Sequence, residues 1–210
     1  MEKLYKGIYK FSEGYYKKKK PFFENLEKGQ NPTVLFITCS DSRIDPNLVT
    51  NSDPGELFIL RNVGNIIPPY NAVSDKNSVA AAIEFAIEGL KIRDIIVCGH
   101  SNCGAMKALY EKEAFFEKMP HLKNWISFAN EIKFNLKDVS NAELKRKTEE
   151  QNVLFQMKNL TTYPIVAELF EKKELRLYAW YYEIGTGKVY EFAPEEKKFK
   201  AIEALKNDLA

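Results

Sequence analysis

Two short polar stretches of the sequence hold the side chains best suited to chemistry. The first, FITCSDSRID at positions 36–45, is an apolar run that ends at Cys39 and continues with Asp41 and Arg43. Because alternate side chains of an extended chain project to the same side, the thiol, the carboxylate and the guanidinium would lie together there. The second stretch, HSNCG, places His100 and Cys103 three residues apart. Each motif alone is a weak signal, but together they predict a site.

The residue types in these stretches suit a zinc ion. Two thiolates and one imidazole are a ligand set that Zn²⁺ favours, and sulfur ligands argue against magnesium or calcium. The sequence leaves the fourth ligand open, because Asp41 would close a structural site whereas water would leave a catalytic one. A guanidinium can hold a carboxylate through two parallel hydrogen bonds, so Arg43 would keep Asp41 off the metal and free to accept a proton from bound water. The spacing therefore favours catalysis.

The elements that must position these residues alternate between strands and helices. Continuous apolar runs predict buried strands at 33–38, 56–62 and 94–100, of the kind found in parallel sheets. Helices are predicted at 78–90, 103–116 and over much of 121–171, followed by strands at 174–184 and 187–192 and a helix in the last dozen residues. This order predicts an α/β fold: a mostly parallel central sheet flanked by helices, with an antiparallel edge strand near the C-terminus. Both polar stretches follow strands at their carboxyl ends, where such sheets bind ligands.

The bulk properties of the chain narrow the function classes. Among 210 residues, 31 basic and 29 acidic side chains leave a net charge of +2, so no general field favours nucleic acid. No segment has the roughly 20 apolar residues of a membrane span, and the N-terminus lacks an apolar leader, which predicts a cytoplasmic protein without a membrane partner. Three cysteines make no disulfide framework. Apolar residues at helical intervals predict an N-terminal helical arm over 1–28, followed by a single α/β zinc-enzyme domain over 29–210.

These residues resemble the β-class carbonic anhydrases. The motifs CSDSR and GHSNCGA match the zinc motifs of that family, and GELFILRNVGNIIPPY is similar to the segment between them. The resemblance implies that Cys39, His100 and Cys103 bind one zinc ion per chain and that Asp41 and Arg43 orient its hydroxide. The implied activity is that of a lyase, the reversible hydration of carbon dioxide to bicarbonate and a proton by attack of zinc-bound hydroxide.

The resemblance also implies a substrate pocket and an assembly. The positions that match the family's substrate-binding residues are Gln30, Phe58, Val63, Phe85 and Gly104. Arg61 and Tyr182 are similar to two residues of a regulatory bicarbonate site found in some members, but Phe36 replaces the tryptophan of that site. This difference, together with Gln30, favours the plant-like branch with an open metal site. The N-terminal arm would embrace a neighbouring subunit in a homodimer or homotetramer.

Other interpretations of the same residues remain open from sequence alone. Cys39 and Cys103 could be ordinary buried residues, as we expect Cys98 to be, but that leaves His100 and Asp41 unexplained at the same edge. The same chemistry could serve a hydrolase acting on carbon disulfide or carbonyl sulfide. A third possibility is a non-catalytic assembly module in which Asp41 is a permanent zinc ligand.

Overall fold

The computed structural model of the protein describes residues 1–136 and 139–203. It contains six β-strands: β1 (Val34–Cys39), β2 (Leu57–Asn62), β3 (Asp94–His100), β4 (Arg176–Glu183), β5 (Lys188–Ala193) and β6 (Lys198–Ala201). The α-helices are α1 (Glu2–Lys10), α2 (Lys20–Leu26), α3 (Pro46–Thr50), α4 (Ser78–Glu84), α5 (Gly104–Ala108), α6 (Pro120–Ile126), α7 (Glu131–Asn135), α8 (Asn141–Leu160) and α9 (Pro164–Glu171). Two π-helical segments, η1 (Phe11–Tyr16) and η4 (Phe85–Gly89), and four 3₁₀ turns, η2 (Val63–Asn65), η3 (Tyr70–Ala72), η5 (Glu113–Phe116) and η6 (Ser127–Ala129), complete the described elements.

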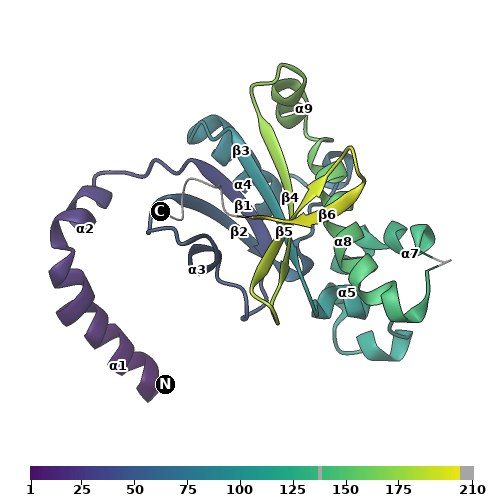
Figure 1. Ribbon diagram of the computed structural model, residues 1–210, viewed down its shortest axis with the longest axis horizontal. Helices are drawn as coiled ribbons and strands as arrows, with labels where there is room; N and C mark the ends of the chain where they lie inside the picture. Colours follow the sequence, from purple (N-terminus) through teal and green to yellow (C-terminus); the bar gives the residue numbers. More distant parts are fainter. Residues whose placement is uncertain (137–138, 204–210) are drawn as a thin grey trace.

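The six strands form one sheet in the order β2-β1-β3-β4-β5-β6. The strands β1 to β4 pair in parallel, and β5 and β6 join as antiparallel strands at one edge. Figure 1 shows this twisted sheet at the centre of the molecule with helices beside it. The predicted α/β class and mostly parallel sheet are thereby confirmed.

The main hydrophobic core lies between one face of the sheet and the helices α4, α8 and α9. It is formed by fully buried aliphatic side chains of β1 and β3, which alternate along the strands as a pleated sheet requires. The opposite face carries a smaller buried cluster of Phe36, Ile96 and Cys98, and the partly buried Trp180 packs against it. Cys98 is therefore a core residue, as the sequence predicted. A third cluster surrounds the ends of β1 and β3 and packs against α5, α6 and α7.

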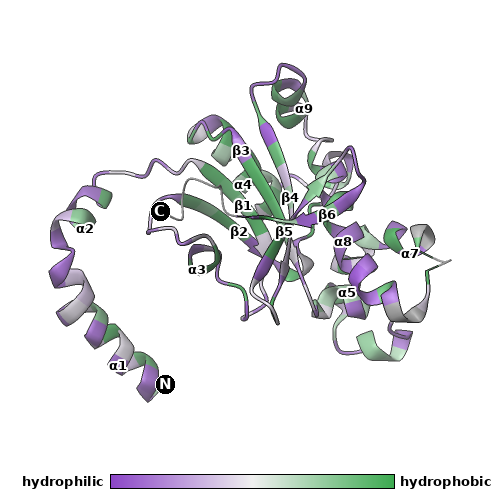
Figure 2. Cartoon of the chain, viewed as in Figure 1, coloured by the Kyte–Doolittle hydropathy of each residue, from purple (hydrophilic) through white to green (hydrophobic). Residues whose placement is uncertain are grey.

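The N-terminal helices form the predicted arm. Figure 1 shows α1 and α2 extending away from the sheet, and α1 has no buried residue. The large apolar residues Leu4, Tyr5, Ile8 and Tyr9 on α1 are all at least 60% exposed. Figure 2 shows that hydrophobic residues line parts of this helix although it covers no core of its own chain.

Two predicted helices differ from the structure. The helix expected over 103–116 is only the short α5, because Lys133 Nζ donates to the carbonyl of Leu109 at 3.1 Å and Tyr110 turns to bond Thr148 at 2.9 Å. The helix expected over the last dozen residues is wrong at 199–201, which belong to β6, and β6 pairs with β5 through Phe192 and Phe199. Residues 204–210 of that prediction lie outside the described residues.

Candidate metal centre

The ends of two adjacent parallel strands bring the predicted ligands together. Cys39 is the last residue of β1 and His100 the last of β3, and the two strands pair in register through Thr38 and Cys98. Cys103 directly precedes α5, three residues after His100. The carboxyl edge of the sheet therefore carries all three side chains, as the sequence predicted.

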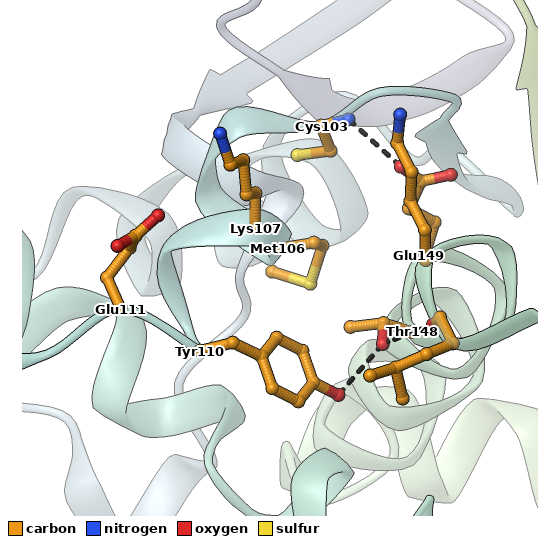
Figure 3. A pocket seen from close by; sticks show the side chains of 9 residues that line it. Cys103, Met106, Lys107, Tyr110, Glu111, Thr148 and Glu149 are labelled. Carbon is orange, nitrogen blue, oxygen red and sulfur yellow. Dashed lines mark hydrogen bonds between the residues drawn. The ribbon is translucent and has the colours of Figure 1, made fainter. Parts of the chain in front are cut away.

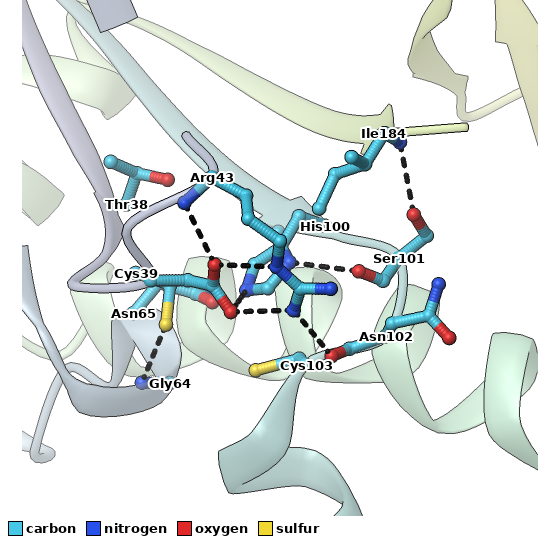
Figure 4. A network of polar contacts seen from close by, with 12 residues as sticks. Thr38, Cys39, Arg43, Gly64, Asn65, His100, Ser101, Asn102, Cys103 and Ile184 are labelled. Carbon is cyan, nitrogen blue, oxygen red and sulfur yellow. Dashed lines mark hydrogen bonds and ion pairs between the residues drawn. The ribbon is translucent and has the colours of Figure 1, made fainter. Parts of the chain in front are cut away.

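The three ligand atoms form a buried group suited to a metal ion. Cys39, His100 and Cys103 are all buried, and their two Sγ atoms and one ring nitrogen lie within 4.8 Å of one another. His100 Nδ1 lies 2.9 Å from the carbonyl of Ser101, to which it donates, so that Nε2 carries the free lone pair. Nε2 is buried without a hydrogen-bond partner among the described residues. Two thiols and one unpaired imidazole nitrogen fit zinc, and Figure 4 shows them converging.

The two thiols of this group differ in acidity. The neighbouring Cys103 thiol, together with His100 and the backbone N–H of Gly64, lowers the pKa of Cys39 to about 4. The pKa of Cys103 is raised because it lies beside the Cys39 thiolate and is deeply buried. The Cys39 thiol therefore ionises more readily than an ordinary cysteine, and a bound cation would favour ionisation of its neighbour as well.

Asp41 and Arg43 form the bidentate pair that their spacing predicted. Arg43 Nε donates to Asp41 Oδ1 at 2.9 Å and Nη2 donates to Oδ2 at 2.7 Å. The backbone N–H of Arg43 also donates to Oδ1 at 3.0 Å, and Nη2 reaches the carbonyl of Asn102 at 3.0 Å. These donors hold the pKa of the Asp41 carboxyl well below its usual range. Asp41 Oδ2 lies 3.9 Å from His100 Nε2, so an ionised acceptor stands at the edge of the ligand group.

Arg61 holds the backbone of this loop. Its Nε donates to the carbonyl of Cys39 at 3.1 Å and its Nη2 to the carbonyl of Asp41 at 2.8 Å. Phe36, at the position where a tryptophan was expected for a regulatory site, is buried against Trp180 in the far-face cluster and offers no polar hydrogen. The guanidinium of Arg61 therefore serves the backbone of the metal loop.

A cavity of about 310 Å³ opens onto Cys39 and Asp41. Two of the predicted substrate-binding residues, Val63 and Gly104, line it. The remaining wall residues are Ser40, Ala105, Ala108, Phe115 and Leu122. Phe115 and Leu122 were not predictable from the sequence, since neither lies in a recognisable motif. Most of the wall is apolar, as a small nonpolar ligand would require.

The other three predicted substrate-binding residues lie elsewhere in the single chain. Gln30 is exposed in the link between α2 and β1. Phe58 lies four residues before Asn62, the partner of Cys39, and so about 13 Å down β2 from the metal ligands. Its ring packs against that of Phe85 at 5.8 Å, and Phe85 is 50% exposed. In the described part of one chain, none of the three lines the cavity at Cys39.

A second cavity lies behind Cys103, between α5 and α8. It measures about 410 Å³ and is lined by Met106, Lys107, Tyr110 and Glu149 among others, as Figure 3 shows. Glu149 is 3% exposed and accepts the Cys103 N–H at 3.2 Å and the Tyr181 hydroxyl at 2.8 Å. Burial raises the pKa of Glu149. The backbone of Cys103 is therefore anchored on α8, a role of Glu149 that the sequence did not suggest.

Comparison with known proteins gives consistent matches. A family model described as carbonic anhydrase matches residues 34–189. A carbonic anhydrase of Synechocystis sp. is 40% identical over an alignment of 214 residues that covers 97% of this chain and 77% of that protein. The solved structure of the beta-carbonic anhydrase CcaA matches with a TM-score of 0.91 and 40% identity, covering 97% of this chain and 92% of that one. A structure from a report on two tetrameric beta-carbonic anhydrases of Sordaria macrospora matches with a TM-score of 0.75 and 26% identity, covering 91% of this chain and 93% of that one.

Proposed function

The chain belongs to the carbonic anhydrase family, in its β class, and on that premise we propose how its own residues serve the reversible hydration of carbon dioxide to bicarbonate and a proton. Zinc is the metal of this family, and Cys39, His100 and Cys103 hold it. The observation that carries this assignment is the buried, unpaired Nε2 of His100 beside two thiols, with an ionised carboxylate 3.9 Å away. When bound, zinc supplies a nucleophile at neutral pH by lowering the pKa of a water molecule.

Asp41 and Arg43 orient that water. Arg43 donates one hydrogen bond to each oxygen of the Asp41 carboxylate, and the remaining lone pair of Oδ2 would accept a hydrogen bond from the water that zinc activates. Because the pKa of Asp41 is held well below its usual range, this oxygen is an acceptor throughout the neutral range. Arg43 is itself held by the carbonyl of Asn102, which ties the pair to the loop of Cys103.

The apolar wall beside this pair holds the substrate. Val63 and Gly104 line this wall together with Phe115 and Leu122. An apolar cavity of about 310 Å³ accommodates carbon dioxide without offering it strong hydrogen bonds.

The metal site is of the open, plant-like kind. Asp41 is bound to Arg43 through two side-chain hydrogen bonds and is not part of the compact ligand group. A carboxylate held in this way is available to water and not to the metal, which supports a catalytic site over a closed structural one. The absence of an N–H donor at Phe36 supports the same branch.

The active form is a homo-oligomer in which the neighbouring subunit completes the pocket. Support comes from the exposed apolar side chains of α1 and from the position of Gln30, Phe58 and Phe85 away from the cavity of their own chain. The half-exposed ring of Phe85 is suited to contact a second chain. A homodimer is the smallest assembly that meets this need, and a homotetramer is the larger alternative.

The location of the protein is proposed to be the cytoplasm. All three cysteines are free and buried, which suits a reducing compartment. Among the described residues, no helix has the length and apolar character of a membrane span.

Stopped-flow hydration of carbon dioxide with a pH indicator tests this function. The zinc-loaded protein should accelerate hydration far above the uncatalysed rate, and the same protein stripped of metal should lose that acceleration. Stoichiometric zinc without hydration between pH 6 and 9 would instead favour the structural module or the hydrolase of sulfur analogues.

A further inference from the structure

The 3₁₀ turn η2 places a backbone donor on one of the metal ligands. The N–H of Gly64 donates to Cys39 Sγ at 3.3 Å. Gly64 has φ +81°, a conformation that favours glycine, and an added Cβ would meet the Cβ of Ala105 at 2.9 Å. The next residue, Asn65, also has a positive φ of 47° although it is not glycine. Gly64 and Asn65 are therefore two successive left-handed residues, which give this turn its sharp bend.

A tryptophan holds the peptide that contains this donor. Trp125 Nε1, on α6, donates to the carbonyl of Val63 at 2.8 Å. That carbonyl and the Gly64 N–H belong to one planar peptide unit, so fixing the oxygen also fixes the direction of the hydrogen. A hydrogen bond accepted by the oxygen also polarises the peptide and strengthens donation by its N–H.

An asparagine on α8 holds the other side of Gly64. Asn152 Nδ2 donates to the carbonyl of Gly64 at 3.0 Å and lies 3.3 Å from Asn65 Oδ1. Asn152 is 1% exposed, and its own Oδ1 accepts from Gln156 Nε2 at 2.9 Å. Both the amide nitrogen and the amide oxygen of Asn152 are therefore held by hydrogen bonds. Its burial would be costly without these partners.

Together these contacts clamp Gly64 from two directions. We propose that Trp125 and Asn152 are positioning residues that aim the Gly64 N–H at Cys39 Sγ and thereby reduce the electron donation of that thiolate to the metal. Two thiolates make zinc a weak Lewis acid, so a donor on one of them restores part of its acidity. The inference rests on the proposed role of Cys39 as a metal ligand.

Cobalt substitution measures this effect directly, because the sulfur-to-cobalt charge-transfer band reports the electron density on the thiolates. The test variants are Trp125→Phe, which keeps an aromatic ring and removes the N–H, and Asn152→Leu. In both, the band should move to longer wavelength, since a thiolate without its donor is easier to oxidise. Affinity for cobalt, measured by competition with a chromophoric chelator, should fall about tenfold or more, because the loop that carries the ligand sulfur is then less well preorganised.

Matched controls separate this role from general destabilisation. Asn159→Leu removes the same kind of bond on the same helix, the donation by Asn159 Nδ2 to the carbonyl of Ile67 at 2.8 Å, three residues beyond Gly64. Trp180→Phe removes an indole N–H that bonds Glu191 at 3.3 Å. Both controls should keep the wild-type band even where urea unfolding shows a similar loss of stability.

The outcomes are distinct. A wild-type band in folded Trp125→Phe would overturn the inference, as would an equal shift in the controls. If the unsubstituted protein showed no sulfur-to-cobalt band at all, the proposed metal site itself would be wrong. The tryptophan variant decides the question if Asn152→Leu does not fold.

Discussion

At the scale of single residues, the position of one carboxylate separates two kinds of zinc site. Asp41 lies beside the ligand group, but both its oxygens are engaged by Arg43, at 2.9 and 2.7 Å. A carboxylate that coordinates the metal contributes to metal binding and so to the stability of the protein. A carboxylate that binds the reacting water affects mainly the rate of hydration. The two roles therefore predict different results from the same substitution.

We expect Asp41→Ala to lower the rate of carbon dioxide hydration by about 10²- to 10⁴-fold, the usual contribution of a positioned proton acceptor. Zinc content, measured by atomic emission, should remain at one ion per chain. Asp75→Asn, at an exposed position remote from the site, should leave both quantities unchanged. Loss of zinc and of thermal stability in Asp41→Ala would mean that Asp41 is a structural ligand.

The sequence could identify the residues that act through their own side chains. Cys39, His100 and Cys103 follow buried strands, and the geometry of parallel sheets then brings them to one edge. It could not identify Trp125 or Asn152, because each acts on a backbone carbonyl more than sixty residues earlier in the chain. Such pairings depend on tertiary packing and leave no local pattern.

At the scale of elements, α8 is unusual because polar side chains form much of its buried surface. Gln156 accepts the N–H of Ile67 at 2.8 Å, and Asn159 donates to the carbonyl of the same residue at 2.8 Å. In sequence such residues resemble a solvated helix face, and only the structure shows that they bind an extended segment. Beyond the end of α8, the Tyr163 hydroxyl binds the same extended segment by donating to the carbonyl of Pro68 at 3.0 Å.

The buried Tyr163 makes the free energy of unfolding depend on pH. The side chain is fully buried, and burial raises the pKa of Tyr163 from 10 to about 12. Above pH 10 the unfolded chain releases this proton while the folded chain retains it, so the stability contributed by the neutral phenol is present below pH 10 and declines towards pH 12. At pH 10.5 the loss should be about 1 kcal/mol.

Urea unfolding of Tyr163→Phe checks this expectation. At pH 8 the variant should be less stable by about 1 kcal/mol, because the Pro68 carbonyl loses its donor. The difference should shrink between pH 8 and 10.5, whereas the exposed Tyr5→Phe should follow the unsubstituted protein. Parallel curves for Tyr163→Phe and the unsubstituted protein would contradict the expected shift.

The strands and the class of fold were predictable because buried parallel strands are continuous apolar runs. β1, β2 and β3 each lie within one residue of their predicted bounds. The short α5 and the strand β6 were not predictable, since Lys133, Tyr110 and the pairing of Phe199 with Phe192 override local helical preference.

At the scale of the whole molecule, the first helix of the arm buries none of its residues against its own chain. Ile8 and Tyr9 on α1 are 65% and 68% exposed, and a single chain gains nothing from holding them in water. The double variant Ile8→Asp/Tyr9→Asp should therefore convert the proposed oligomer to a monomer, with a large loss of activity. Light scattering after gel filtration measures this change, and Lys3→Asp on the same helix is the control. An unchanged oligomer would show that the arm lies outside the interface.

Complementation tests whether two chains share one pocket. Asp41→Ala and Gln30→Ala should each lower activity when every chain of the assembly carries the change. If Gln30 serves the cavity of its neighbour, a mixed assembly contains one site with both residues intact. Co-expression of the two variants should then give more activity than either variant alone. Activity no higher than that of the parents would place Gln30 and Asp41 in the same chain's site.

The contacts around Gly64 also bear on whether the metal binds before or after synthesis of the chain is complete. All three proposed zinc ligands lie within the first 103 residues, as does Arg61, but three other side chains that fix their loops come from positions 125, 149 and 152. When Cys103 of a nascent chain has just left the ribosome, all three ligands are present, but the side chains at positions 125, 149 and 152 that hold their loops are not yet available. Metal capture should follow chain completion, and the refolding rate of the purified protein should be the same with or without zinc. In this respect the molecule is the opposite of a zinc finger, whose metal organises the chain.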